Sequence, residues 1–362
     1  MTTKNSRRDH KYDICFLPMK AMILTGIRRI EITEKPVPEI IQSDEVLIRV
    51  MSVGVCGSDI HYYNEGKIGS QVVKFPFTLG HECSGIVEKT GPGVKRLKTG
   101  DRVAIDPAMP CYNCSQCRKG RYHTCLNLRF LGCPDQAEGC LSEYIVMPER
   151  SCYKIDNTMP FDIATLSEPL SIGLYATELA GNVQAQKIGI LGSGPIGVSV
   201  MLMALHKGAE RVFMTDLIDE RLSLVSSMGA HWTGNPLKQD IVGDIKREEP
   251  ELLDIVFECC GKQEAASQAV KLLKPGGMLV IAGIPSFSEW KFSAEDIRRK
   301  EITIRNVRRQ NEMVQPTLDI LSAGKINPEK MITHTFDLDH VSDAFELVAG
   351  YRDGVMKAMI HL

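Results

Sequence analysis

The sequence has little of what several classes of protein require. Its 362 residues carry a formal net charge of only −2 at pH 7, so we expect no strong attraction to nucleic acid or to a membrane. No apolar run reaches the roughly eighteen residues that a membrane-spanning helix needs. The opening segment, MTTKNSRRDHKYD, is polar and lacks the apolar core of a signal peptide. We therefore expect a globular cytoplasmic protein whose partners include neither nucleic acid nor membrane.

Cysteine falls short of the density of a disulfide scaffold, but four cysteines are concentrated in one segment, CYNCSQCRKGRYHTC. Twelve cysteines in the whole chain are too few for a disulfide scaffold, and a reducing compartment would keep them as thiols. Gaps of two, two and seven residues allow four thiolates to converge on one zinc ion in a closed, structural site. We expect this structural zinc in a lobe of about residues 106–126, held by Cys111, Cys114, Cys117 and Cys125. An iron–sulfur cluster and ordinary thiols are the alternatives.

Short apolar runs divide the chain into two regions. The earlier region contains β-like runs such as EVLIRVMSV and ECSGIVEKT between Gly, Pro and Asp residues, which favours an all-β, barrel-like module. The later region alternates strand-like KIGIL, RVFMTD and LLDIVFECC with helix-like segments, which is typical of a doubly wound parallel sheet. We predict an α/β protein with an N-terminal extension over 1–18, a β-barrel domain over 19–170 and 306–362, and a parallel-sheet domain over 171–305.

A glycine-rich turn stands between a predicted strand and a predicted helix. The segment from Gly192 to Gly197 reads GSGPIG, and this pattern permits a tight turn, a close approach of pyrophosphate and close helix packing. Asp216 follows at the end of the next strand, where a carboxylate binds a ribose 2′-hydroxyl and repels a 2′-phosphate. We therefore expect NAD(H) in preference to NADP. A glycine turn without a ligand and a helix-capping Asp216 are the alternatives. The expected cofactor-binding residues are Gly192, Gly194, Pro195, Ile196, Gly197, Asp216 and Arg221.

Four residues elsewhere are candidates for a reactive metal site. A catalytic zinc needs about three protein ligands and one open position. The candidates are Cys56 in GVCGSDIHYY, His81 and Glu82 in LGHECSG, and Glu168 in LSEPLSIG. Taken singly, each is also consistent with a buried structural residue or a surface charge.

Together these motifs resemble a known family. CGSDIHYY, GHECSG, GDRVAIDP, the four-cysteine lobe, SEPLSIGLYA, GSGPIG and LKPGG are similar to the motifs of zinc-dependent medium-chain dehydrogenases, and most similar to the polyol branch that includes sorbitol, xylitol and iditol dehydrogenases. The resemblance extends from Met19 to the C-terminus. It implies a GroES-like β-barrel catalytic domain joined to a Rossmann domain, with NAD(H), one catalytic and one structural zinc per chain, and a homodimer or homotetramer.

The resemblance also implies a set of ligands for the catalytic zinc. Cys56, His81 and Glu168 would hold the ion. Glu82 would lie beside it and bind directly, through water or only during ligand exchange. Alcohol-type relatives carry a second cysteine in place of Glu168, so the glutamate points toward polyols.

Three residues near Cys56 would support the chemistry. By resemblance, Ser58 contacts the reacting oxygen and starts a proton relay. His61 would continue the relay or pack near the cofactor. Asp59 would orient His81 by a hydrogen bond, with a turn-capping role as the alternative.

Substrate contacts follow from the same resemblance. Tyr62 and Phe130 match positions that line the pocket in the polyol branch. Relatives carry an aromatic-Arg-Tyr triplet where this chain reads Arg308-Arg309-Gln310, so Arg309 matches and its neighbours do not. Two arginines followed by amides suggest a more polar substrate, such as a cyclic polyol, an inositol, a sugar, or a compound with a carboxylate or phosphate.

The expected function is reversible, NAD-dependent oxidation of a secondary hydroxyl of a polyol, cyclitol or sugar to a ketone. A threonine-type or amino-alcohol dehydrogenase is the near alternative, but those relatives usually carry Thr in place of Ser58 and lack the Tyr62-Tyr63 pair. A non-catalytic zinc scaffold is the alternative from another class.

Overall fold

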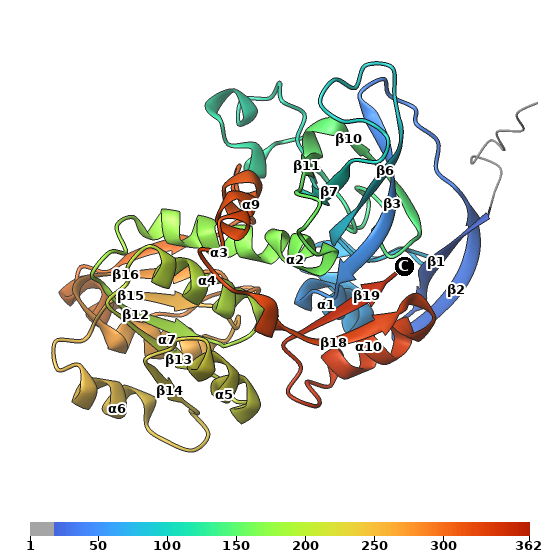
Figure 1. Ribbon diagram of the computed structural model, residues 1–362. Helices are drawn as coiled ribbons and strands as arrows, with labels where there is room; N and C mark the ends of the chain where they lie inside the picture. Colours follow the sequence, from blue (N-terminus) through green and yellow to red (C-terminus); the bar gives the residue numbers. More distant parts are fainter. Residues whose placement is uncertain (1–17) are drawn as a thin grey trace, which may run out of the picture.

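The computed structural model describes residues 18–362, which form two domains that lie side by side (Figure 1). The predicted N-terminal extension falls outside the described residues, except for Pro18, which opens the first strand. Over residues 18–362, no helix is both long and apolar enough to cross a membrane.

The first domain is built on a seven-stranded sheet with the order β11-β7-β6-β3-β19-β18, in which β10 also pairs with β3. Its strands are β3 (Glu45–Gly54), β6 (Glu82–Thr90), β7 (Arg102–Ile105), β10 (Tyr144–Pro148), β11 (Cys152–Lys154), β18 (Ile332–Asp337) and β19 (Lys357–His361). Consecutive residues of β3 are buried, and because they point to opposite faces, both faces of this central strand are covered. Strand β19 comes from the C-terminus and pairs antiparallel with β3, so the chain returns to this domain.

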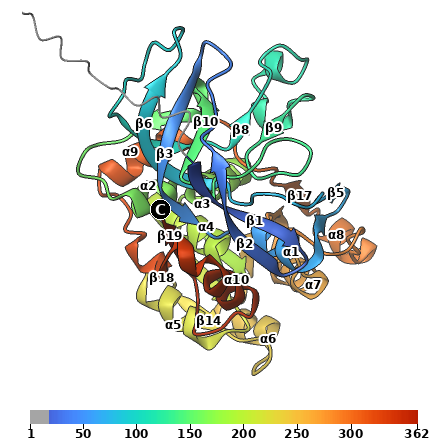
Figure 2. The same cartoon turned by 90° about the vertical axis from the view of Figure 1, so that its right-hand side faces the viewer.

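Smaller elements surround this sheet. They are the strands β1 (Pro18–Gly26), β2 (Arg29–Pro36), β4 (Lys67–Ile68), β5 (Gln71–Val72), β8 (Ala108–Met109) and β9 (Arg129–Phe130), and the helices α1 (Gly57–Glu65), α2 (Phe161–Thr165) and α10 (Val341–Ala349). Figure 2 shows the β1–β2 hairpin above α10, with α1 beside both. The edge of the Tyr63 ring packs against Phe345 with ring centroids 5.3 Å apart, which joins α1 to α10.

The second domain contains a six-stranded parallel sheet with the order β14-β13-β12-β15-β16-β17, which confirms the predicted doubly wound sheet. Its strands are β12 (Lys187–Leu191), β13 (Arg211–Thr215), β14 (Trp232–Gly234), β15 (Leu253–Glu258), β16 (Leu273–Ile281) and β17 (Thr303–Asn306). The chain builds outward from β12 to β14 and then crosses to the other side of β12. Ligands of such sheets bind at this reversal, beyond the carboxyl ends of the strands.

Helices cover the parallel sheet and the region where the domains meet. They are α3 (Ser167–Ala180), α4 (Pro195–His206), α5 (Asp219–Ser227), α6 (Ile241–Glu248), α7 (Gln263–Leu272), α8 (Ala294–Arg299) and α9 (Val314–Ser322). Short 3₁₀ helices are η2 (Cys117–Lys119), η3 (Tyr122–Thr124), η4 (Glu149–Ser151), η5 (Glu329–Met331) and η6 (Leu338–His340).

One apolar core fixes the two domains against each other. Helix α3 lies where they meet and packs against α4 (Figure 1). The cluster around it combines Leu170 and Ile190 with Ala104, Ile155 and Met359 of the first domain. Burial of a large apolar side chain stabilises the fold by roughly 1.5–3 kcal/mol. This shared core therefore holds the glycine turn in a defined position relative to the β-rich domain.

Candidate active site and zinc lobe

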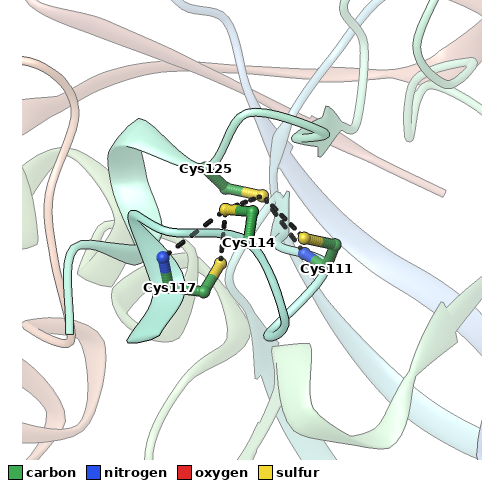
Figure 3. A group of neighbouring side chains, drawn as sticks. All are labelled: Cys111, Cys114, Cys117 and Cys125. Carbon is green, nitrogen blue, oxygen red and sulfur yellow. Dashed lines mark hydrogen bonds between the residues drawn. The ribbon is translucent and has the colours of Figure 1, made fainter. Parts of the chain in front are cut away.

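The four cysteines of the lobe converge on one point (Figure 3). The sulfur of Cys114 lies 3.5 Å from that of Cys117 and 3.9 Å from that of Cys125, and the Cys111 and Cys125 sulfurs are 3.5 Å apart. A tetrahedral zinc with Zn–S bonds of about 2.3 Å separates its sulfurs by about 3.8 Å. No disulfide joins these four residues. The donor set therefore fits a closed zinc site.

Hydrogen bonds from backbone amides lower the pKa of two of these four cysteines. The N–H groups of Cys117 and Leu126 donate to the Cys114 sulfur and lower the pKa of this thiol to about 6. Hydrogen bonds, first of all from the Asn113 amide, also lower the pKa of Cys111. Burial instead raises the pKa of Cys117 to about 12. Thiolates are the form of cysteine that binds metal, so the loop favours the charged state at Cys111 and Cys114, and Cys117 would lose its proton when the ion binds.

A second group of possible ligands lies at the start of α1 and β6. The ligand atoms of Cys56, His81 and Glu82 lie within 4.8 Å of one another. Cys56 directly precedes α1, and Glu82 is the first residue of β6. The histidine and the glutamate are buried, whereas the cysteine is half-buried. A sulfur, an imidazole and a carboxylate with partial access to solvent fit a metal site with an open position.

Asp59 makes both of the contacts that were considered for it. One carboxylate oxygen lies 3.3 Å from Nδ1 of His81, and the other accepts a hydrogen bond from the Cys56 amide at 3.1 Å, which caps α1. A partner at Nδ1 leaves Nε2 of the imidazole as the ligand atom. Burial lowers the pKa of His81, but Asp59 and Cys56 raise it well above its usual range.

Glu168 lies near this centre but outside its closest group. It stands in the first turn of α3 and is buried, yet the 4.8 Å group does not include it. Burial raises the pKa of Glu168 to about 7, with an opposing effect of His81 and a further increase from Glu82. Glu168 thus lies close enough to His81 and Glu82 for their charges to affect its pKa. Its role as a ligand stays a prediction.

Glu82 has a partner that sequence reasoning missed. Its two carboxylate oxygens lie 2.8 and 2.7 Å from Nζ of Lys357, the first residue of β19, and both side chains are 1% exposed. The same Nζ donates to the carbonyl of Val55 at 3.2 Å. A buried charge is stable only when it is paired, so the ion pair with Lys357 holds the Glu82 side chain beside Cys56 and His81. The charged residue in the apolar run VMKAMIHL was the available signal.

The two predicted relay residues lie on α1. The Ser58 hydroxyl lies 3.3 Å from the Cys56 sulfur, where it donates a hydrogen bond. His61 follows three residues later on the same face of the helix, and its Nδ1 lies 3.4 Å from Oε1 of Glu65. Its side chain is 32% exposed. Ser58 thus lies beside Cys56, and His61 lies nearer to solvent.

The glycine turn connects β12 to α4 at the reversal of the parallel sheet. Gly192 has φ of +104°, which favours glycine, and a Cβ on Gly197 would collide with the Gly192 carbonyl oxygen. A Cβ on Gly194 would meet only Nη1 of Arg221, at 3.5 Å. Pro195 is the first residue of α4, followed by Ile196. The space over Gly194 thus suits a pyrophosphate at a helix N-terminus.

Asp216 and Arg221 lie beside this turn. One oxygen of Asp216 accepts a hydrogen bond from the Ser193 amide at 2.8 Å, and the other accepts one from Ile218 at 3.0 Å. Arg221 donates through Nε and Nη2 to the Val355 carbonyl at 2.9 and 2.5 Å. Carboxylate oxygens can accept further hydrogen bonds, so Asp216 retains capacity for a ribose hydroxyl.

The group formed by Cys56, His81 and Glu82 is called the second centre below. The three residues predicted to bind substrate lie on one side of it. The guanidinium carbon of Arg309 is 3.5 Å from the centroid of the Phe130 ring, and that ring is 5.7 Å from the ring of His81. The Tyr62 hydroxyl donates to Gln71 at 3.3 Å and lies 3.8 Å from the sulfur of Cys133. Sequence reasoning missed Gln71 and treated Cys133 as an ordinary thiol.

The amides after Arg309 point to other partners. Gln310 is buried, donates to Asp106 at 2.9 Å, and accepts from the Met313 amide at 2.7 Å. Asn311 donates to the Gly120 carbonyl at 2.9 Å and accepts from the Tyr122 amide in the zinc lobe at 3.0 Å. Both amides thus hold this segment in place and are not free for a substrate.

Comparison with known proteins shows the family to which this chain belongs. The model of the alcohol dehydrogenase GroES-like domain matches residues 42–157, and that of the zinc-binding dehydrogenase matches residues 195–323. The chain is 35% identical to sorbitol dehydrogenase of Bacillus subtilis, over 95% of this chain and 97% of that protein. It is 33% identical to L-idonate 5-dehydrogenase of Vitis vinifera, over 94% and 93%. A crystal structure of an Escherichia coli oxidoreductase/dehydrogenase of unknown specificity superimposes with a TM-score of 0.90 at 31% identity, over 95% of this chain and 99% of that one.

This chain therefore belongs to the zinc-dependent medium-chain dehydrogenases, with a GroES-like domain and a Rossmann domain. Within that family it belongs to the polyol dehydrogenase branch. The resemblance and the fold class inferred from the sequence are both confirmed.

Proposed function

We propose that this protein uses NAD⁺ to oxidise a secondary hydroxyl of a polyol, cyclitol or sugar to a ketone, in a reversible reaction. The observation that carries the proposal is the group formed by Cys56, His81 and Glu82, with Asp59 behind the imidazole. The relatives named for sorbitol, D-xylulose and L-idonate support the substrate class.

Zinc is the ion that this donor set suits best. Cys56 and His81 would supply sulfur and nitrogen, and Glu168 or Glu82 would supply the oxygen. When bound, zinc acts as a Lewis acid that lowers the pKa of a substrate hydroxyl. Because Lys357 neutralises Glu82, we favour Glu168 as the permanent ligand, with Glu82 as a neighbour of the ion.

The residues of α1 would control the proton and the geometry. Ser58 lies beside Cys56, where its hydroxyl would accept the proton of the substrate hydroxyl while it releases its own proton toward His61. His61 would pass that proton toward solvent, since its ring is partly exposed. Asp59 keeps His81 in the tautomer that presents Nε2.

The Rossmann domain would hold the cofactor. NAD supplies a hydride acceptor, and the turn from Gly192 to Gly197 would bind its pyrophosphate. Asp216 supports NAD over NADP because a carboxylate repels a 2′-phosphate. The four-cysteine lobe would hold a second, structural zinc. The homodimer or homotetramer and the cytoplasmic location stay predictions.

The decisive test is NADH formation over a panel of linear polyols, inositols, aldoses, sugar acids and amino alcohols, with NADP⁺ in parallel. We expect turnover of at least one hydroxylated sugar derivative with NAD⁺, and zinc analysis should give two ions per chain. Turnover of amino alcohols alone would favour the threonine-type alternative. One ion per chain and no turnover would favour a zinc scaffold.

A further inference from the structure

A cavity of about 340 Å³ lies where the zinc lobe meets the first domain. The lobe forms part of its lining, the loop before β7 and the short helix η4 form another part, and the segment after Arg309 completes it. The lining includes Tyr112, Tyr122, His123, Arg96, Arg150 and Gln310. No residue of the second centre or of the glycine turn belongs to this lining. The cavity is therefore a separate place from the proposed active site.

The size and walls of this cavity suit a small hydroxylated molecule. Its volume lies at the lower end of the range of ligand pockets, which is about 300–1,000 Å³. The rings of Tyr112 and Tyr122 both line it, with centroids 5.2 Å apart. A phenol offers an apolar surface together with a hydroxyl group. A ligand of about the size of a sugar therefore fits this lining.

Two exposed arginines bring positive charge to the cavity. Nη2 of Arg96 donates to the Glu149 carbonyl at 2.6 Å. The guanidinium carbon of Arg150, the next residue, lies 4.7 Å from the centroid of the Tyr112 ring. Among residues 18–362, neither guanidinium has a carboxylate oxygen within 4.0 Å. Since a guanidinium carries five N–H donors, both arginines keep donors for an anion from outside the chain.

The two carboxylates of the lining have other surroundings. Asp106 accepts hydrogen bonds from the Ala108 amide and from the Gln310 side chain, each at 2.9 Å. Glu312 is exposed to solvent. Neither forms an ion pair with the two arginines, so a bound anion would lie on the arginine side of the cavity.

His123 adds a buried polar group whose partner is missing. The residue lines the cavity and is 5% exposed. Its Nε2 lies 3.0 Å from the hydroxyl of Tyr175 on α3. Its Nδ1 is inaccessible to solvent and has no hydrogen-bond partner in the part of the chain that the structure describes. Buried polar atoms of native proteins are nearly always paired, so this atom points to a partner that is not part of the chain.

The cavity is connected to the proposed substrate pocket by a short segment. Gln310 and Asn311 line the cavity, and the residue before them, Arg309, packs on the ring of Phe130. Asn311 accepts a hydrogen bond from the Tyr122 amide of the lobe at 3.0 Å. A ligand that bridges the lobe and the first domain would fix the lobe, and through Asn311 it would fix the segment that carries Arg309.

We propose that this cavity is a regulatory site for a small hydroxylated anion. Its carboxylate or phosphate would pair with Arg96 and Arg150, because arginine binds either group through parallel hydrogen bonds. Its hydroxyl groups would lie against the tyrosines. Binding there needs no turnover, so the inference does not depend on which substrate the active site oxidises.

The test is calorimetric titration of the zinc-loaded protein with four probes. They are a hexose 6-phosphate, the corresponding hexonate, the neutral hexose and inorganic phosphate. We expect one of the two organic anions to bind with a Kd of about 0.1 mM or tighter, and the better one distinguishes phosphate from carboxylate. Inorganic phosphate that binds as tightly as the better organic anion would indicate an adventitious ion only and would overturn the proposal.

Variants assign the binding to this cavity. Arg150→Gln should weaken the better anion at least about tenfold, since it removes hydrogen bonds from a charged group. Arg150→Lys keeps the charge but not the fork and should retain part of the affinity. Arg298→Gln, at an exposed arginine of α8 in the other domain, is the matched control. Cys56→Ser alters the second centre and should leave the Kd unchanged.

Kinetics test the regulatory role. A saturating amount of the better anion should change KM of a reacting polyol at least about fivefold, and Arg150→Gln should remove this effect. Unchanged kcat and KM at saturation would contradict regulation. Absence of binding by both organic anions would overturn the site itself, as would binding that Cys56→Ser abolishes and Arg150→Gln retains. If no compound reduces NAD⁺, the proposed function fails, but the binding measurements still decide this inference.

Discussion

The zinc lobe takes all four of its sulfurs from one short segment, whereas the second centre gathers its groups from across the chain. Cys56 and His81 precede different elements, α1 and β6, and Lys357 lies 275 residues from its partner Glu82. The lobe offers cysteines alone, but the second centre offers a sulfur, an imidazole and a carboxylate. Four cysteines from one short segment suit a closed structural site, whereas mixed donors from distant segments suit a metal site with an open position.

The two centres should differ most in their response to the replacement of a single cysteine. Cys56→Ser should reduce kcat by about 10³-fold or more, because a weak oxygen donor replaces the thiolate, while the unfolding transition is retained. Cys111→Ser should instead lower the thermal unfolding temperature and the soluble yield, since structural zinc binding contributes to folding. Kinetics, circular dichroism and zinc content measure these effects.

Cys152→Ser is the control for a serine at a buried thiol that neither centre uses. It should retain both turnover and two zinc ions. Equal loss of fold in the Cys56 and Cys111 variants would remove the distinction between the centres.

The pair formed by Lys357 and Glu82 should contribute strongly to stability. Lys357→Met leaves a buried carboxylate without its partner and should cost about 3–5 kcal/mol of unfolding free energy, measured by denaturant titration. The double variant Lys357→Met/Glu82→Gln removes both charges and should recover most of that loss. A single variant as stable as the wild type would show that Glu82 is protonated or differently paired.

Asp59 should affect zinc at only one centre. Asp59→Asn weakens the orientation of His81 and should lower zinc affinity there about 10–100-fold, with the lobe unaffected. Competition with a chromophoric chelator would show one weakened and one unchanged site per chain. Asp44→Asn, at an exposed position, is the control, and loss of affinity at both sites would contradict the separation.

The second centre should also respond to acid. Burial raises the pKa of Glu168 to about 7, and protons compete with zinc for ligands. If Glu168 is a ligand, the zinc affinity of the second centre should therefore fall as the pH falls through 7. Zinc content after dialysis between pH 8 and 5 measures this effect, and an unchanged content at the second centre over that range would count against Glu168 as a ligand.

How well each region could be predicted depends on how far apart its interacting residues lie in the sequence. The four-cysteine spacing, the GSGPIG turn and the strand–helix alternation are local patterns, so their geometry could be inferred directly. Lys357 could not be assigned because its partner lies in another element, and only the fold places β19 and β6 on either side of β3. Gln310 and Asn311 were taken as signs of a polar substrate, but their partners in the lobe and at Asp106 lie about 190–204 residues away.

The central claim is that this chain holds one zinc in the lobe and a second, reactive zinc at Cys56 and His81. A crystal structure with anomalous diffraction at the zinc edge tests it most directly. We predict two peaks per chain, one among the four lobe sulfurs and one about 2.3 Å from the Cys56 sulfur and about 2.0–2.1 Å from Nε2 of His81. A zinc-saturated crystal with a peak in the lobe alone would contradict the account.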